Sequence, residues 1–183
     1  MIDNLFLAVA FTDEERHALA AALTESTGPA RIPGKRTSPE NWHVTLSFIG
    51  ECSDADSDRI AHSISDQLNA VHAKVWCTGL DAFPTSSKAT VIYTAVDDPT
   101  NVLTYLAGIC DEAAVDAGYG PEQRPYVPHV TLSRLRPSMD VHHLLSAHGD
   151  FRVPVVVSGV TMFRSRATSN GPRYEAIERM PLR

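Results

Sequence analysis

Two histidines stand in identical five-residue settings, one in each half of the chain. The sequence HVTLS occupies residues 43–47 and again residues 129–133. Polar and apolar residues alternate in both copies, which predicts β-strands with Val and Leu facing a core and with His and Thr on the opposite face. Two such strands could hold one anion between a pair of acid/base groups, and a phosphate is the natural candidate.

A pair of histidines suits displacement at phosphorus. A base must take a proton from the attacking oxygen and an acid must protonate the departing oxygen, and imidazole, with a pKa near ~6.5, can serve as either. The hydroxyls of Thr45 and Thr131 lie on the same strand faces and can donate to phosphate oxygens. Neither motif offers a second histidine or a carboxylate as a metal ligand. We therefore expect His43 and His129 to be catalytic, and we expect no metal and no cofactor.

Strands and helices alternate on either side of these motifs. In the first half we expect a strand at 5–11, a helix that a capping box opens at 12–15 and that runs to about 27, the first motif strand, a helix from about 53, and a strand at 74–83. In the second half we expect a strand at 90–96, a helix at 101–117, the second motif strand, a short helix at 141–148 and two final strands. The loop at 28–41 carries Arg31, Lys35 and Arg36 and could help to hold a phosphate.

This order of elements predicts an α+β fold. We expect a bilobal single domain over residues 1–183, made of two pseudo-symmetric small antiparallel sheets flanked by helices, with a central groove. Each lobe would carry one of the two motifs. Trp42, Phe48 and Phe83 are expected to pack in the interior rather than to stack on a nucleotide base.

Composition narrows the setting of the protein. A chain of 183 residues with 43% hydrophobic content suits one packed domain, and its net charge of −6 argues against broad affinity for duplex nucleic acid. Three cysteines without a CxxC pair indicate a reducing compartment. The sequence shows neither a secretion signal nor the ~18 apolar residues of a membrane span. We expect a cytoplasmic monomer with no membrane association and no obligate protein partner.

The two motifs and their surroundings resemble the two-histidine (2H) phosphoesterase superfamily. The likeness is to its RNA 2′,3′-cyclic phosphodiesterase branch, formerly described as 2′-5′ RNA ligase. It covers nearly the whole chain and is carried by the sequences LFLAV at 5–9, PENWHVTLSFIG at 39–50, RPYVPHVTLSR at 124–134, FRS at 163–165 and GPRYE at 171–175. One HxTx motif alone would be weak, but two in matching contexts are specific.

The resemblance implies hydrolysis of a terminal 2′,3′-cyclic phosphate of RNA or a nucleotide to a 2′-phosphomonoester. On that basis His43 protonates the leaving 3′ oxygen and His129 activates the attacking water, while Thr45, Thr131 and Arg134 hold the phosphate oxygens. In a regular strand, Arg134 would share the face of the apolar residues of its motif. It therefore reaches the phosphate only if the strand twists or ends there.

Three other functions fit the same residues. Two are enzymatic, namely 2′-5′ RNA ligation, which is the reverse direction, and hydrolysis of another cyclic phosphate such as an ADP-ribose derivative. Microscopic reversibility means that the same two histidines serve each of them. The third is a non-catalytic module that binds nucleotides or RNA ends, although both intact motifs argue against it.

Overall fold

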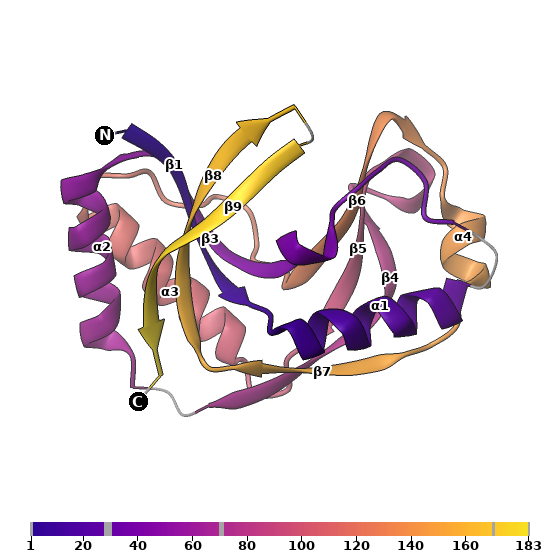
Figure 1. The fold of residues 1–183 in the computed structure, drawn as a ribbon, viewed down its shortest axis with the longest axis horizontal. Helices are drawn as coiled ribbons and strands as arrows, with labels where there is room; N and C mark the ends of the chain where they lie inside the picture. The colour runs from indigo at the N-terminus through magenta and orange to yellow at the C-terminus, as the bar shows by residue number, and fades with distance from the viewer. Residues whose placement is uncertain (1, 28–30, 70–71, 170, 183) are drawn as a thin grey trace.

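Two antiparallel sheets lie side by side in the computed structural model, which describes residues 2–27, 31–69, 72–169 and 171–182 (Figure 1). We call them sheet A and sheet B. Sheet A has the strand order β3-β1-β8-β9, formed by β1 (Ile2–Ala10), β3 (His43–Ser53), β8 (Gly159–Thr168) and β9 (Gly171–Pro181). Sheet B has the strand order β2-β6-β5-β4-β7, formed by β2 (Lys35–Arg36), β4 (Ala73–Phe83), β5 (Ala89–Asp97), β6 (His129–Met139) and β7 (Arg152–Val157).

Helices cover the outside of this pair of sheets. The helices α2 (Asp54–Gln67) and α3 (Val102–Asp116) contact each other, and α3 also packs against β3 of sheet A. On the other side of the molecule α1 (Asp13–Thr27) runs along β7 of sheet B, and α4 (His142–Ala147) lies at the far end (Figure 1). Two short 3-10 helices, η1 (Pro39–Asn41) and η2 (Ser86–Lys88), precede β3 and β5. The predicted α+β fold of two small antiparallel sheets flanked by helices is confirmed.

Local sequence signals account for the helix starts. The backbone N–H of Thr12 donates to a carboxylate oxygen of Glu15 at 2.8 Å, and the N–H of Glu15 donates to the Thr12 hydroxyl at 3.2 Å, which is the predicted capping box. The other carboxylate oxygen of Glu15 accepts from the N–H of Val156 at 2.7 Å. The first turn of α1 therefore also covers part of the open edge of β7, where unpaired N–H groups would otherwise be exposed.

The apolar faces of the two motif strands point into a shared core. Val44 and Val130 are fully buried, and Leu46 and Leu132 expose 5% and 3% of their surface. They belong to one hydrophobic cluster that also includes residues of α2, α3 and β4. Burial of these residues fixes which way each strand faces. His43 and Thr45 in β3, and His129 and Thr131 in β6, therefore lie on the opposite face of their strand, which we call the inner face.

Each sheet takes strands from both halves of the chain. The strand β4 from the first half lies in sheet B, and β8 and β9 from the end of the chain lie in sheet A. The prediction of two final strands is wrong, because β7, β8 and β9 follow α4. Only Ser158 separates β7 of sheet B from β8 of sheet A. This close passage requires glycine at position 159, because a Cβ atom there would lie only 2.9 Å from the Cα of Pro181. No helix within the described ranges has the length and apolar character needed to cross a membrane.

Candidate active site

The first residues of β3 and β6 are the two motif histidines, and their rings are held in the same way. The Nδ1 atom of His43 lies 2.7 Å from the carbonyl oxygen of Asn41, and the Nδ1 atom of His129 lies 2.7 Å from the carbonyl oxygen of Val127. A carbonyl oxygen can only accept, so each Nδ1 carries the proton and donates it. In the neutral rings the Nε2 atoms are therefore the ones with a free lone pair, which is the form that a general base requires.

Thr45 already contacts the first of these reactive nitrogens. Its hydroxyl oxygen lies 3.1 Å from the Nε2 atom of His43. Because the neutral ring holds its proton on Nδ1, Nε2 accepts and the hydroxyl donates. Thr131 stands at the corresponding position of β6, paired with Tyr93 and half-buried on the inner face. Both predicted threonines thus lie on the same faces as the histidines.

A β-bulge brings Arg134 to the inner face. In the pairing of β5 with β6, Tyr93 is opposite Thr131 and Ile92 is opposite Ser133, so Leu132 is an extra residue. An extra residue reverses the alternation of faces beyond it. Ser133 is buried beside Leu132, and Arg134 returns to the face of the histidine and is exposed. The prediction required the strand to twist or end for Arg134 to reach this face, and the structure shows a bulge instead.

The same bulge occurs in β3 and turns Phe48 away from the hydrophobic core. Ala8 of β1 is opposite Thr45 and Leu7 is opposite Ser47, so Leu46 is the extra residue. Phe48 then lies opposite Phe6 on the inner face and exposes 65% of its surface. The prediction that Phe48 packs in the interior is wrong. Phe48 follows its histidine at the same offset as Arg134, so the two bulges place these residues at corresponding positions.

Of the two other aromatic side chains of that prediction, only Trp42 lies in the interior, and Phe83 is half-buried. Trp42 is buried, with 7% of its surface exposed. Phe83 stacks on Tyr93 with 4.2 Å between ring centroids, and its ring meets the edge of His129 at 5.0 Å. On the other sheet, His43 lies 4.9 Å from the ring of Phe6 and 5.3 Å from that of Tyr174. Each imidazole is therefore surrounded by aromatic rings that exclude water from part of its surface.

This burial shapes the acidity of both imidazoles. Burial, with smaller contributions from the positive charges of His129 and Arg134, lowers the pKa of His43 from 6.5 to about 4, although the hydrogen bond to Asn41 acts in the opposite direction. Burial also lowers the pKa of His129, against the hydrogen bond to Val127 and with a smaller contribution from Arg134. The charge of Arg134 therefore acts on both rings, and the charge of His129 also acts on His43 across the two sheets.

Tyr126 ties the two sheets together next to the motifs. It belongs to the segment that leads into β6, and its hydroxyl donates to the carbonyl oxygen of Thr45 in β3 at 3.1 Å. The side chain is half-buried, and burial raises the pKa of its phenol above the usual range. Because β3 and β6 also contact each other directly, this bond helps to set the spacing between the two histidines.

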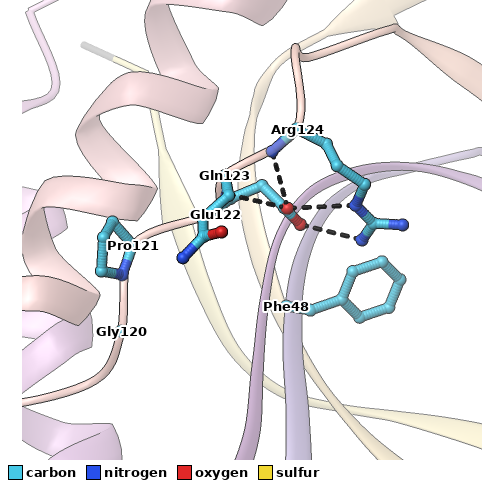
Figure 2. Close-up of a pocket in the computed structure, with 6 residues that line it drawn as sticks. All are labelled: Phe48, Gly120, Pro121, Glu122, Gln123 and Arg124. Atoms are coloured by element: carbon cyan, nitrogen blue, oxygen red, sulfur yellow. Dashed lines mark hydrogen bonds and ion pairs between the residues drawn. The ribbon is translucent and has the colours of Figure 1, made fainter.

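A cavity of about 400 Å³ adjoins Phe48 and is lined by the segment Gly120, Pro121, Glu122, Gln123 and Arg124 (Figure 2). In its wall, the carboxylate of Glu122 accepts from Nε and a terminal nitrogen of Arg124 at 3.1 and 3.0 Å. These hydrogen bonds lower the pKa of Glu122 to about 2. Figure 2 shows the guanidinium of Arg124 and the ring of Phe48, which both line this cavity. Sequence reasoning did not single out this segment.

Metal-ligating side chains do not gather at this site. Across the part of the chain that the structure describes, there is no group of three or more His, Cys, Asp or Glu residues placed to hold a metal ion. The candidate site therefore consists of two imidazoles, two hydroxyls and one guanidinium. Such a set can accept a proton, donate a proton and stabilise negative charge on a phosphoryl group.

The chain has clear relatives. A family model described as "LigT like Phosphoesterase" matches residues 12–93 and 95–174. The chain is 29% identical over 164 residues to the RNA 2′,3′-cyclic phosphodiesterase of Aeropyrum pernix, which covers 86% of this chain and 91% of that protein. It is 29% identical over 178 residues to the protein of the same name from Methanothermobacter thermautotrophicus, which covers 94% and 95%.

Solved structures share its fold. E. coli LigT complexed with 3′-AMP matches with a TM-score of 0.79 at 20% identity, over 100% of this chain and 99% of that chain. The protein TT0787 of Thermus thermophilus matches with a TM-score of 0.76 at 24% identity, over 98% of both chains. At these identities the likeness concerns the arrangement of the two sheets and their helices.

Proposed function

Because the chain belongs to the LigT-like phosphoesterase family, we propose that it hydrolyses the terminal 2′,3′-cyclic phosphodiester of RNA or a nucleotide to a 2′-phosphomonoester. One observation carries this proposal: His43 and His129 are both held through Nδ1 by a backbone carbonyl, which leaves both Nε2 atoms for chemistry. The names of the relatives from Aeropyrum pernix and Methanothermobacter thermautotrophicus support the same substrate.

In the proposed mechanism, the two imidazoles act on opposite sides of one phosphorus atom. The Nε2 atom of His129 takes a proton from water as the water oxygen bonds to phosphorus. The bond from phosphorus to the 3′ oxygen breaks, and the Nε2–H of His43 protonates that oxygen. Each such proton transfer is typically worth about 10² to 10⁴ in rate. Both rings return to their starting states when His129 releases its proton to solvent and His43 takes one up.

His43 needs a bound anion before it can act as the acid. With a pKa of about 4, it is neutral in the free protein near pH 7. A phosphate beside the ring favours the charged form and raises this pKa, since an opposite charge within a few ångströms stabilises imidazolium. Once Nε2 is protonated it no longer accepts from the hydroxyl of Thr45, so that hydroxyl becomes free to donate to a phosphate oxygen.

The other residues of the inner faces complete the proposed site. Thr45, Thr131 and Arg134 hold the non-bridging oxygens, where negative charge builds up in the transition state. Phe48 offers an exposed ring on which the base of the terminal nucleotide can stack. Proton transfer and charge stabilisation are thus supplied by side chains, and we propose that the reaction is independent of metal ions.

The proposal also covers the setting of the enzyme. Its partner is the end of an RNA or a nucleotide, and it acts as a monomer without an obligate protein partner. The thiols of Cys52, Cys77 and Cys110 are all free and buried, which is consistent with a reducing compartment such as the cytoplasm.

An assay with an oligonucleotide that ends in a 2′,3′-cyclic phosphate tests this function. We expect the protein to convert it to the 2′-phosphate in excess EDTA, and we expect His43→Ala and His129→Ala each to slow the conversion by about 10² to 10⁴. His62→Asn is the control, since His62 is an exposed residue of α2 that pairs with Asp66. Loss of activity in EDTA refutes metal independence, joining of ends indicates ligation, and tight binding without turnover indicates a binding module.

A further inference from the structure

The short strand β2 is held firmly against β6. Gly34, which precedes β2, has a φ of +87°, and a Cβ atom there would lie 2.8 Å from the hydroxyl oxygen of Ser133. That hydroxyl donates to the carbonyl oxygen of Pro33. After β2, the N–H of Thr37 donates to the carbonyl oxygen of Leu132 at 2.8 Å. The position of both residues of β2 is therefore built into the fold, although the sequence pattern suggested only a basic loop.

This pairing places Lys35 on the inner face beside Arg134. Lys35 is opposite Arg134, and Arg36 is opposite Ser133. Residues directly opposite each other in an antiparallel pair share a face and have Cβ atoms about 4.5–5.5 Å apart. Because Arg134 lies on the inner face, Lys35 does too. Ser133 is fully buried on the other face, so Arg36 is turned away from the histidines.

Lys35 and Arg134 form a pair of like charges without acidic partners. Like charges directly opposite each other destabilise a strand pair. Among the residues that the structure describes, no carboxylate forms an ion pair with either of them. Acidic residues are not scarce in this chain, which has 22 of them against 16 Lys and Arg. Two uncompensated cations beside two imidazoles suit a ligand with more than one negative charge.

The side chain of Lys35 also has a defined neighbour. Its Nζ atom lies 3.6 Å from the point that a Cβ atom of Gly171 would occupy, at the tip of the β8–β9 hairpin. That tip is held by Asn41, whose side-chain nitrogen donates to the carbonyl oxygen of Pro172 at 2.9 Å. The ammonium group therefore stands where β2 and the hairpin meet, one strand away from the motif histidine of β6.

We propose that Lys35 binds a second phosphate of the substrate, the 5′-phosphate of the terminal nucleotide. In an RNA that ends in a 2′,3′-cyclic phosphate, this is the nearest other phosphate along the chain. Arg134 would bind the cyclic phosphate, and the adjacent ammonium of Lys35 would bind the 5′-phosphate. The inference rests on the proposed function and narrows its substrate, because it makes the enzyme prefer an RNA end over a nucleoside cyclic phosphate that lacks the 5′-phosphate.

The test compares two substrates, uridine 2′,3′-cyclic phosphate with and without a 5′-phosphate. The readout is the ratio of their kcat/KM values in the wild type, in Lys35→Gln and in the matched control Arg36→Gln. We expect the 5′-phosphate to raise kcat/KM in the wild type, and we expect Lys35→Gln to reduce that ratio about fivefold, the upper range for a solvent-exposed ion pair. Arg36→Gln should leave the ratio unchanged.

Three results would overturn the role of Lys35. If Lys35→Gln loses the same kcat/KM on both substrates, Lys35 contacts the reacting phosphate or acts only through its general charge. If Arg36→Gln lowers the ratio as much as Lys35→Gln does, the effect is also one of general charge. A lower midpoint of urea unfolding in Lys35→Gln would contradict the like-charge argument, because removal of the repulsion should not destabilise the fold.

A wild type that cleaves neither substrate would refute the proposed function separately. Calorimetric binding of uridine 2′-phosphate and of uridine 2′,5′-bisphosphate then decides the role of Lys35. If Lys35 holds the second phosphate, the affinity gained from the 5′-phosphate falls in Lys35→Gln and is kept in Arg36→Gln. An equal gain in wild type and Lys35→Gln overturns the proposal.

Discussion

Acidification should destabilise the protein through His43, and substitution of this residue isolates the effect. In an unfolded chain the imidazole binds a proton as the pH falls through 6.5, whereas burial keeps the pKa of folded His43 at about 4. The stability that neutral His43 contributes is therefore fully present above pH 6.5 and is lost progressively between pH 6.5 and 4. The difference between these two pKa values corresponds to about 3 kcal/mol of unfolding free energy.

His43→Asn removes the titrating ring and keeps a side-chain amide that can donate to the carbonyl oxygen of Asn41. Urea unfolding of wild type and variant between pH 7.5 and pH 4 measures both stabilities, and the difference between the two removes the contributions of all other groups. We expect the advantage of the wild type to shrink by about 3 kcal/mol from pH 6.5 to pH 4. A constant difference for His43→Asn would refute the burial argument.

Three further substitutions test other parts of the site. Thr131→Val should lower kcat by about 10²-fold in steady-state assays, because a donor to the transition-state oxygens is lost, and an unchanged kcat would remove Thr131 from the phosphate site. Phe48→Ala should raise KM for a nucleotide substrate about fivefold or more while kcat is retained, as expected for loss of a stacking surface, whereas an equal KM would mean that the base lies elsewhere. Tyr126→Phe should lower the free energy of unfolding by about 1 kcal/mol in urea, since the hydroxyl bond to Thr45 is removed, and a variant as stable as the wild type would show that this bond adds nothing.

The inner and outer faces of the motif strands could be predicted from the sequence because a period of two has one physical meaning. Val44 and Val130 are buried, and the two histidines are turned to the opposite face as expected. The capping box at Thr12 was equally readable, because a helix start depends on residues only three positions apart. Signals of this kind are local and need no knowledge of the partner strand.

The bulges at Leu46 and Leu132 could not be read from the sequence. A bulge is a property of two paired strands, and both copies of HVTLS are as regular in sequence as an uninterrupted strand. One extra residue in each strand moved Arg134 to the inner face and exposed Phe48, against the simple alternation. The placement of β2 escaped prediction for a similar reason, since it depends on the close approach of Gly34 to β6.

The exchange of strands between the two halves was also beyond the sequence pattern. Periodicity predicts that β4 and β8 are strands, but which sheet each one joins depends on packing across the whole chain. This exchange matters for the site, because the sheet of His43 is completed by the last strands, which supply Phe163 and Tyr174 around its ring.

The central claim is that His43 and His129 act as one acid/base pair on one phosphate, and a double-mutant cycle tests it most directly. The measurement is kcat on a cyclic-phosphate oligonucleotide for the wild type, His43→Ala, His129→Ala and the double variant. We predict that each single substitution lowers kcat by about 10² to 10⁴ and that the double variant is little worse than the worse single variant, because groups that act as a unit are not additive. A single variant that keeps kcat within tenfold of the wild type, or losses that multiply in the double variant, would contradict the account.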